Sequence, residues 1–201
     1  LWQEIPWFSP ELGVRSLPDW ETLPYDVLSP QEDIVSERLE TLYRMTSGTK
    51  GLDVVIASAV TAAQRMAPVA YVGANTFFFR PGDTLSVEGL RSNLAAAGYA
   101  GVKQVLAAGE FAVRGSIIDV FPMGSDRPFR LDLFDDEIES IRWFDVETQR
   151  SMEAVNEIRL LPGHEFPVTP EAVTGFRQRW RTRFAGDPGK SLVYRDIGNG
   201  V

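Results

Sequence analysis

The segment that spans residues 111–145 constrains the fold more than any other part of the chain. It contains three runs rich in aromatic and β-branched residues, and such runs are typical of β-strands. Residues 122–128, which include Pro, Gly, Ser and Asp, separate the first run from the second. The acidic turn 135–137 separates the second run from the third. The sequence therefore predicts an antiparallel meander.

The alternation of side chains in residues 129–134 predicts which face of this meander is buried. Successive side chains of a strand point to opposite faces of the sheet. One face carries Phe129, Leu131 and Leu133, and the other carries Arg130, Asp132 and Phe134. The first face is therefore a core face, and the second is mixed.

Arg114 falls on the mixed face of the first run, because Phe111 and Val113 fall on the opposite side. Gly115 interrupts this run and is expected to mark a bulge or a close approach of the backbone. If the first two runs are neighbours and their mixed faces coincide, one exposed patch forms, which we name the Arg/Phe patch. It consists of Arg114, Arg130, Asp132 and Phe134.

Two interpretations of the Arg/Phe patch are open from the residues alone. Arginine and phenylalanine are enriched in the buried centres of protein interfaces, which favours a protein-binding surface. Alternatively, Phe134 packs beneath the hairpin and both arginines form ion pairs as part of a solvated charged face. The acidic candidates for these ion pairs are Asp119, Asp132 and Glu139.

Composition excludes several classes of function. The chain has no cysteine and one histidine, His164, so disulfides and thiolate zinc sites cannot form and a histidine-based metal site is not expected. Residues 81–161 carry 8 Lys and Arg against 14 Asp and Glu, which argues against this segment gripping DNA by itself. No apolar run approaches the about 20 residues needed to cross a bilayer, and no signal peptide opens the chain. A soluble, cytoplasmic protein without membrane contact is expected.

Residues 1–80 alternate between predicted helices and strands. The pattern predicts a short strand at 14–17, a helix from Ser29 to Met45, a buried parallel strand at 51–58, a short helix at 61–66 and a strand at 75–80. This order is typical of an α/β domain. The implied parallel sheet has too few strands here, so we expect a partial domain whose remainder precedes Leu1 or lies in a missing segment.

Residues 81–161 predict a small α+β domain. Ser86 is expected to cap a helix that runs through Ala97 and stops at Gly98. This helix would pack across the meander, and residues 155–161 would add one more strand. About 80 residues are enough to fold around a single core.

Residues 162–201 begin a further segment with a predicted helix at 170–184. Arginine occupies every second position from Arg177 to Arg183, which covers much of the helix circumference. A solvated face is favoured, and a DNA contact is the open alternative. Residues 189–191, Gly-Lys-Ser, match the end of the phosphate-binding loop motif G-x-x-x-x-G-K-[ST]. The first glycine of that motif would have to be at residue 184, which is Phe. No catalytic residue is predicted, and His164 is expected to pack or to form hydrogen bonds.

Five collinear motifs resemble the amino-terminal, UvrB-homologous module of bacterial transcription-repair coupling factors. They are LPDWETLPYDVLSPQEDIVSERL at 17–39, VIASAVTAAQR at 55–65, GEFAVRGSIIDVFPMGS at 109–125, FRLDLFDDEIESIRWFD at 129–145 and LLPGHEFPVTPE at 160–171. The third and fourth motifs are also similar to the nucleotide-excision-repair protein UvrB. The resemblance covers most of residues 17–171, and the last forty residues contribute less.

The resemblance implies a fold class of α/β plus α+β. Residues 1–80 would be a partial helicase-like α/β domain, and 162–201 the start of a following helical or α/β segment. Residues 81–161 would be an inserted small α+β domain, an antiparallel sheet packed by a helix, that binds UvrA. By position, the UvrA-contacting residues of the family fall on Arg114, Arg130 and Phe134, with Asp132 as a weaker candidate. The resemblance thus favours the protein-binding interpretation of the Arg/Phe patch.

The function implied by the resemblance is recruitment of nucleotide excision repair to stalled RNA polymerase through UvrA. The chain itself is expected to be non-catalytic and to hold no cofactor or metal. RNA polymerase, DNA, ATP and magnesium would be bound by parts of the full-length family protein beyond Val201. The alternative function is a DNA-binding accessory segment of an ATP-dependent translocase.

Two departures from UvrB limit the resemblance. UvrB-like sequences carry an aromatic-rich hairpin that pries at damaged DNA, whereas this chain passes directly through residues 19–30, so damage verification is not expected. UvrB-like chains also read FRVRG where this chain has Ala112. One arginine is therefore missing near the predicted UvrA contact.

Overall fold

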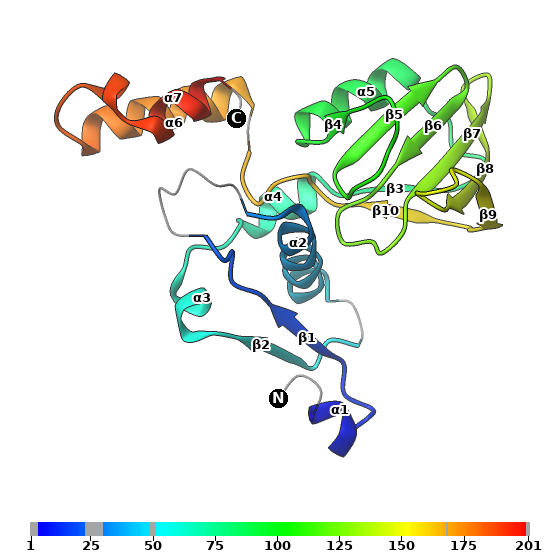
Figure 1. Cartoon of the computed structure of the whole chain (residues 1–201), viewed down its shortest axis with the longest axis horizontal. Helices are drawn as coiled ribbons and strands as arrows, with labels where there is room; N and C mark the ends of the chain where they lie inside the picture. Colours follow the sequence, from blue (N-terminus) through cyan, green and yellow to red (C-terminus); the bar gives the residue numbers. More distant parts are fainter. Residues whose placement is uncertain (1–3, 23–29, 49–50, 168, 200–201) are drawn as a thin grey trace.

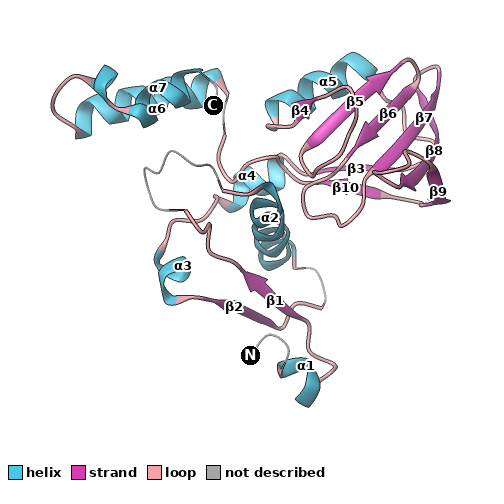
Figure 2. Cartoon of the chain, viewed as in Figure 1, coloured by secondary structure: helices cyan, strands magenta, loops and turns pink. Residues whose placement is uncertain are grey.

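The meander becomes the centre of a six-stranded sheet in the computed structural model, which describes residues 4–22, 30–48, 51–167 and 169–199. The strands lie in the order β4 (Ala100–Gly101), β5 (Glu110–Arg114), β6 (Ile117–Val120), β7 (Phe129–Phe134), β8 (Glu137–Phe144) and β9 (Ser151–Ala154). Neighbouring strands are antiparallel except for β4 and β5, which are parallel. Figure 1 shows this sheet beside helix α5, and Figure 2 distinguishes its strands from the helices.

The first predicted run folds as two strands, which corrects the interpretation of Gly115. This glycine has a φ of +63° and lies in the tight turn that joins β5 to β6, with Arg114 opposite Ile117. Glycine adopts positive φ without the steric cost that a Cβ would bring. A register shift typical of a bulge occurs instead between β7 and β8, where Asp132 pairs with Ser140 and Leu133 with Ile138, so that the extra residue, Glu139, lies in β8. Consequently β6, and not β5, is the direct neighbour of β7.

Helix α5 (Val87–Ala96) packs against one face of the sheet, as the sequence predicted. The Ser86 side chain caps it by accepting a hydrogen bond from the Gly89 amide at 3.3 Å. Leu90 and Leu94 of α5 share a buried cluster with Leu131 and other residues of the sheet. The antiparallel strands and this helix confirm a mixed α+β architecture.

Helix α2 (Glu32–Ser47) contacts both this core and the amino-terminal strands. Its Leu39 is fully buried in the same cluster as α5. On another side of α2, the Thr41 hydroxyl donates a hydrogen bond to the Ser16 carbonyl of β1 (Val14–Leu17) at 2.7 Å. Strand β1 pairs in parallel with β2 (Val54–Ala57), with Val14 opposite Val54. The parallel strand predicted at 51–58 is confirmed, but it is shorter and only partly buried.

Other element boundaries differ from those predicted. Helix α2 begins at Glu32 with Gln31 as its N-cap, so Pro30 precedes the helix, and Ser29 lies outside the described residues. Helix α3 (Ala59–Ala63) begins two residues early, because the Ser58 hydroxyl accepts a hydrogen bond from the Thr61 amide at 3.0 Å. Helices α1 (Ile5–Phe8) and α4 (Val69–Ala74) and strands β4 and β9 were not predicted.

Strands β3 (Phe77–Phe79) and β10 (Ile158–Leu160) pair with each other antiparallel, with Phe78 opposite Arg159. The chain therefore enters and leaves the six-stranded sheet and α5 side by side (Figure 1). The strands predicted at 75–80 and 155–161 are confirmed, each three residues long. The predicted divisions at residues 81 and 162 stay predictions.

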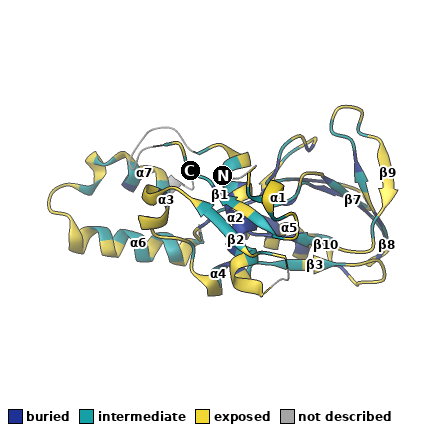
Figure 3. Cartoon of the chain, turned by 90° about the horizontal axis from the view of Figure 1, so that it is seen from below, coloured by how far each residue is buried: buried dark blue, intermediate teal, exposed yellow. Residues whose placement is uncertain are grey.

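Helix α6 (Pro170–Arg183) is confirmed at the position that the sequence predicted, and the Thr169 hydroxyl caps it. A 3-10 turn, η1 (Pro188–Lys190), leads to α7 (Leu192–Asn199), which lies beside α6 and away from the sheet (Figure 1). The ring centroids of Trp180 and Tyr194 lie 6.1 Å apart. No residue of α6 is buried, in contrast to α2 (Figure 3). Within the described ranges, no helix combines the length and the apolar character needed to cross a membrane.

A buried ion pair joins α2 to the segment that follows β10. The Arg38 guanidinium is fully buried and donates to both carboxylate oxygens of Glu165, including from Nη2 to Oε2 at 3.2 Å. The Trp20 indole donates to Glu165 Oε1 at 3.0 Å, and the centroid of its ring lies 4.7 Å from the guanidinium carbon of Arg38. Removing one member of such a pair leaves a buried charge without its partner.

We expect Glu165→Ala to lower the free energy of unfolding by about 3 kcal/mol, because the buried Arg38 loses its counter-ion. Urea denaturation followed by circular dichroism measures this loss. The matched control is Glu157→Ala, which removes the partner of Arg80 from a pair whose side chains are 40% and 66% exposed. The control should cost less than about 1 kcal/mol, and equal losses in the two variants would contradict the prediction.

The burial of His164 predicts that the stability of the fold depends on pH. Burial lowers the pKa of His164 below its ordinary 6.5, while its ring stacks on Phe166 with centroids 5.9 Å apart. As pH falls through 6.5, His164 gains a proton in the unfolded chain before it does so in the folded chain. The free energy of unfolding therefore falls as pH falls. We expect the wild type to lose stability relative to His164→Gln between about pH 7 and about pH 5. A constant difference across this range, measured by urea denaturation, would contradict the assignment.

Candidate protein-binding site

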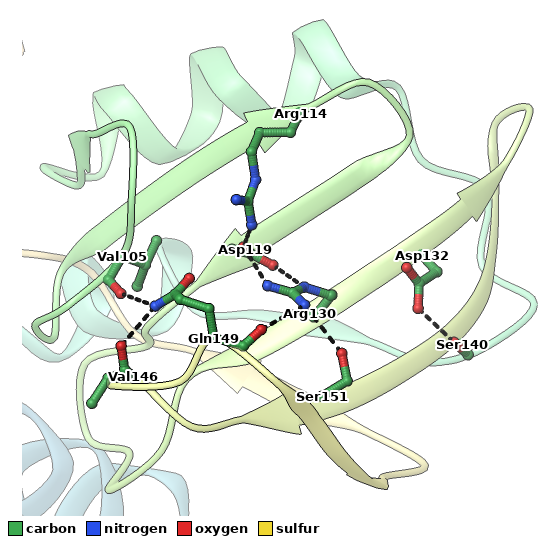
Figure 4. A network of polar contacts seen from close by, with 9 residues as sticks. All are labelled: Val105, Arg114, Asp119, Arg130, Asp132, Ser140, Val146, Gln149 and Ser151. Atoms are coloured by element: carbon green, nitrogen blue, oxygen red, sulfur yellow. Dashed lines mark hydrogen bonds and ion pairs between the residues drawn. The ribbon is translucent and has the colours of Figure 1, made fainter.

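The charged centre of the site is Asp119 on β6, a carboxylate that is 1% exposed. Its Oδ1 accepts a hydrogen bond from Arg130 Nε at 2.7 Å, and its Oδ2 accepts one from Arg130 Nη2 at 2.9 Å. Arg114 also donates to Oδ2 through Nη2. Figure 4 shows the two guanidinium groups meeting at this one carboxylate. A buried carboxylate needs such partners, because desolvation without them is costly.

Arg130 is the more enclosed of the two arginines. Its side chain is 13% exposed, and Nη1 donates to the Gln149 carbonyl and the Ser151 hydroxyl, both at 3.2 Å. Its guanidinium carbon lies 4.9 Å from the ring centroid of Phe144, a cation-π contact. The hydrogen bond to Asp119 raises the pKa of Arg130, which keeps it charged. Arg130 therefore ties β6, β7 and β9 together.

Arg114 is the accessible arginine of the pair. Its side chain is 48% exposed, and it lies at the end of β5 next to the Gly115 turn. Because both arginines reach the same carboxylate, they lie on the same face of the sheet. This outer face is opposite to the one covered by α5, as the alternation of residues predicted.

Phe134 is exposed at the end of β7, with 71% of the residue open to solvent. It does not pack beneath the hairpin, so that part of the second interpretation is wrong. Asp132 is half-buried and accepts a hydrogen bond from the Ser140 hydroxyl at 3.0 Å. Asp132 faces Ile117 across the strands, and Ile117 in turn faces Arg114. The four predicted residues thus share one face, with both arginines paired as the second interpretation proposed.

The position of Ala112 explains how the outer face is partly covered. Ala112 is 3% exposed and packs with Val105 and Phe144 in a second, smaller hydrophobic cluster. The Gln149 side-chain amide donates to the Val105 carbonyl at 3.3 Å, which links this cover to the β8–β9 turn (Figure 4). A large side chain at residue 112 would have to displace this cover. The open part of the face is therefore the end that carries Arg114 and Phe134.

Acidic side chains surround the open end of the outer face. Asp135, Asp136 and Glu137 form the exposed turn that follows Phe134, and Glu139 is also exposed. A surface with this charge repels the phosphates of nucleic acid. The arrangement suits contact with a protein, through the Phe134 ring and the accessible guanidinium of Arg114.

The other candidate residues lie elsewhere. In α6, the guanidinium carbons of Arg177 and Arg181 lie 5.5 Å and 5.9 Å from the ring centroid of Tyr194, so these two arginines contact α7.

At residues 186–191, the Asp187 carboxylate accepts a hydrogen bond from the Gly189 amide at 2.9 Å. A carboxylate at this amide opposes phosphate binding, in agreement with the sequence analysis.

Sequence reasoning missed the structural roles of Phe144 and Gln149, which support Arg130 from the β8–β9 region. It named Asp119 only as one of three possible partners for the arginines. The signal for Asp119 was its place in the apolar run IIDVF, where an acidic residue requires a paired partner. For Gln149 no local signal existed, because its contacts depend on how the β8–β9 turn folds back.

This chain is similar to transcription-repair-coupling factors and to the UvrB interaction domain. The family model of the UvrB interaction domain matches residues 77–166. The transcription-repair-coupling factor of Escherichia coli is 44% identical over 201 residues, which is 100% of this chain and 17% of that protein. The same-named protein of Haemophilus influenzae is 46% identical over 187 residues, which is 92% of this chain and 16% of that protein. That of Rickettsia bellii is 29% identical over 200 residues, 18% of its length. The chain thus spans about one sixth of these relatives.

The shared carboxylate predicts unequal stability effects for the two arginines. We expect Arg130→Met to lower the free energy of unfolding by about 2 kcal/mol, because Arg130 is enclosed and its loss weakens the neutralisation of Asp119. The matched change Arg114→Met should cost less than about 1 kcal/mol, since that pair is exposed on one side. Urea denaturation of both variants is the measurement. A larger loss for Arg114→Met would show that the roles are reversed.

Proposed function

We propose, from the premise that this chain belongs to the transcription-repair-coupling factor family, that it is a protein-interaction module that binds UvrA. In this role it recruits nucleotide excision repair to stalled RNA polymerase. The observation that carries the proposal is Phe134, an exposed aromatic ring on the same face of the sheet as Arg114, in the segment matched by the UvrB interaction domain. Rings of this kind are frequent anchors of protein interfaces.

The shape and charge of the outer face support a protein partner. Phe134 and Arg114 lie at the end that no other part of the described chain covers, next to the acidic turn 135–137. A ring with so much exposed apolar surface gains free energy when a partner covers it. The acidic surroundings disfavour DNA as the ligand of this face. UvrA is the partner because the UvrB type of interaction domain implies it, so UvrB and this chain would compete for the same site.

The chain acts in this proposal by binding and not by chemistry. The full-length protein would supply the motor that uses ATP and magnesium, and it would hold RNA polymerase and DNA through segments outside this chain. The proposed place of action is the cytoplasm. Arg130 and Asp132 belong to the proposed surface as its partly covered members.

We expect Phe134→Ala to weaken binding to UvrA about 30-fold, which corresponds to the about 2 kcal/mol typical of an interface anchor. Isothermal titration calorimetry with purified chain and UvrA is the measurement. The matched control is Phe8→Ala, because Phe8 is 81% exposed on α1, outside the segment matched by the UvrB interaction domain. The control should bind as the wild type does.

A competition arm tests the identity of the binding site on UvrA. Excess UvrB should release the chain from UvrA, whereas bovine serum albumin at the same concentration should not. Unchanged affinity of Phe134→Ala would remove Phe134 from the interface. Simultaneous binding of UvrB and the chain to one UvrA site would contradict the competition.

A further inference from the structure

Asp119 is a residue that a partner protein cannot reach. It is 1% exposed, yet both of its carboxylate oxygens are bonded to arginines of the outer face. Its contacts are therefore internal to the chain. Any effect of Asp119 on binding must act through the groups that it holds.

The two arginines depend on Asp119 to different degrees. Arg130 has further acceptors in the Gln149 carbonyl and the Ser151 hydroxyl, and it also lies against the Phe144 ring. Arg114 donates its hydrogen bond to Asp119. Without the carboxylate, Arg130 would keep several contacts, whereas the exposed Arg114 side chain would be released into solvent.

A released arginine binds a partner less well than a fixed one. The side chain of arginine samples many rotamers, and fixing them on binding costs conformational entropy. When the free protein already holds the guanidinium in place, that entropy is not lost at the moment of association. The shared carboxylate holds the Arg114 guanidinium on the outer face, at the carboxylate that also binds Arg130, before any partner arrives.

We infer that Asp119 is a positioning residue of the UvrA-binding surface, which fixes Arg114 in advance on the same face as Phe134. This inference rests on the proposed function and adds a residue that no partner touches. A purely structural role for Asp119 makes a different prediction: its substitution would weaken the fold without any specific link to Arg114. The two roles separate in a double-mutant cycle.

The test compares UvrA affinity for the wild type, Asp119→Asn, Arg114→Ala and the double variant by isothermal titration calorimetry. Asparagine keeps the size of the side chain and removes its charge. We expect Asp119→Asn to weaken binding on the order of tenfold, which is the range for one side chain that must be fixed on binding. In the Arg114→Ala background the same change should have no further effect. Equal losses in both backgrounds, or no loss at all, would overturn the inference.

The matched control is Asp83→Asn, which removes the same charge at an exposed site where the carboxylate accepts a hydrogen bond from the Arg80 amide. It should leave UvrA affinity unchanged, so that an effect of net charge on association is excluded. Circular dichroism and thermal unfolding confirm that each variant is folded at the temperature of the titration.

A measurement on the wild-type chain covers the case in which Asp119→Asn does not fold. Nitrogen-15 relaxation of the arginine side chains should show restricted motion of the Arg114 guanidinium, compared with that of the exposed Arg142. Equal mobility of the two groups would overturn the inference without any variant.

The titrations also distinguish this inference from the proposed function. If the wild type does not bind UvrA, or if Arg114→Ala and Phe134→Ala both bind unchanged, the proposed function fails and the inference falls with it. If those two variants lose affinity while Asp119→Asn does not, only the inference fails.

Discussion

A single buried carboxylate organises the outer face of the six-stranded sheet. Asp119 lies in β6 between apolar residues, and its charge is compensated by guanidinium groups from β5 and β7. A charge that is removed from water requires partners in good geometry, so the enclosed Arg130 cannot point elsewhere without a large loss of free energy, whereas the loss of the half-exposed Arg114 costs less. The need to neutralise Asp119 therefore decides where the cations of this surface lie.

The same principle acts at the junction between the sheet and the amino-terminal strands. Arg38 of α2 is fully buried against Glu165, and the Leu39 side chain next to it enters the buried cluster between the sheet and α5. One helix thus packs on two sides, with an ion pair on one of them and an apolar side chain on the other. The backbone of β3 and β10 adds a second connection between the same parts.

Exposure, and not charge alone, separates the residues that support the surface from those that could meet a partner. Arg130 and Arg114 share one carboxylate, but only Arg114 is widely open to solvent. Phe134 is open because the β7–β8 turn ends the sheet there, with nothing in the described chain folded over it. The acidic turn 135–137 lies next to the exposed ring of Phe134, on the face that also carries Arg114. This combination favours a protein over a nucleic acid as the binding partner.

The sequence by itself determined the elements whose signals are local. Alternation in residues 129–134 assigned Leu131 and Leu133 to the core and Phe134 to the outer face, and the cap at Ser86 predicted α5, because both depend on near neighbours in the chain. The prediction of a bulge at Gly115 was wrong, because a glycine between two β-type runs is compatible with a bulge and with a tight turn. Only the tertiary structure decided that Arg130 is enclosed while Arg114 is open. That difference comes from Phe144, Gln149 and Ser151, which approach Arg130 through the β8–β9 turn, and no local pattern encodes such a contact.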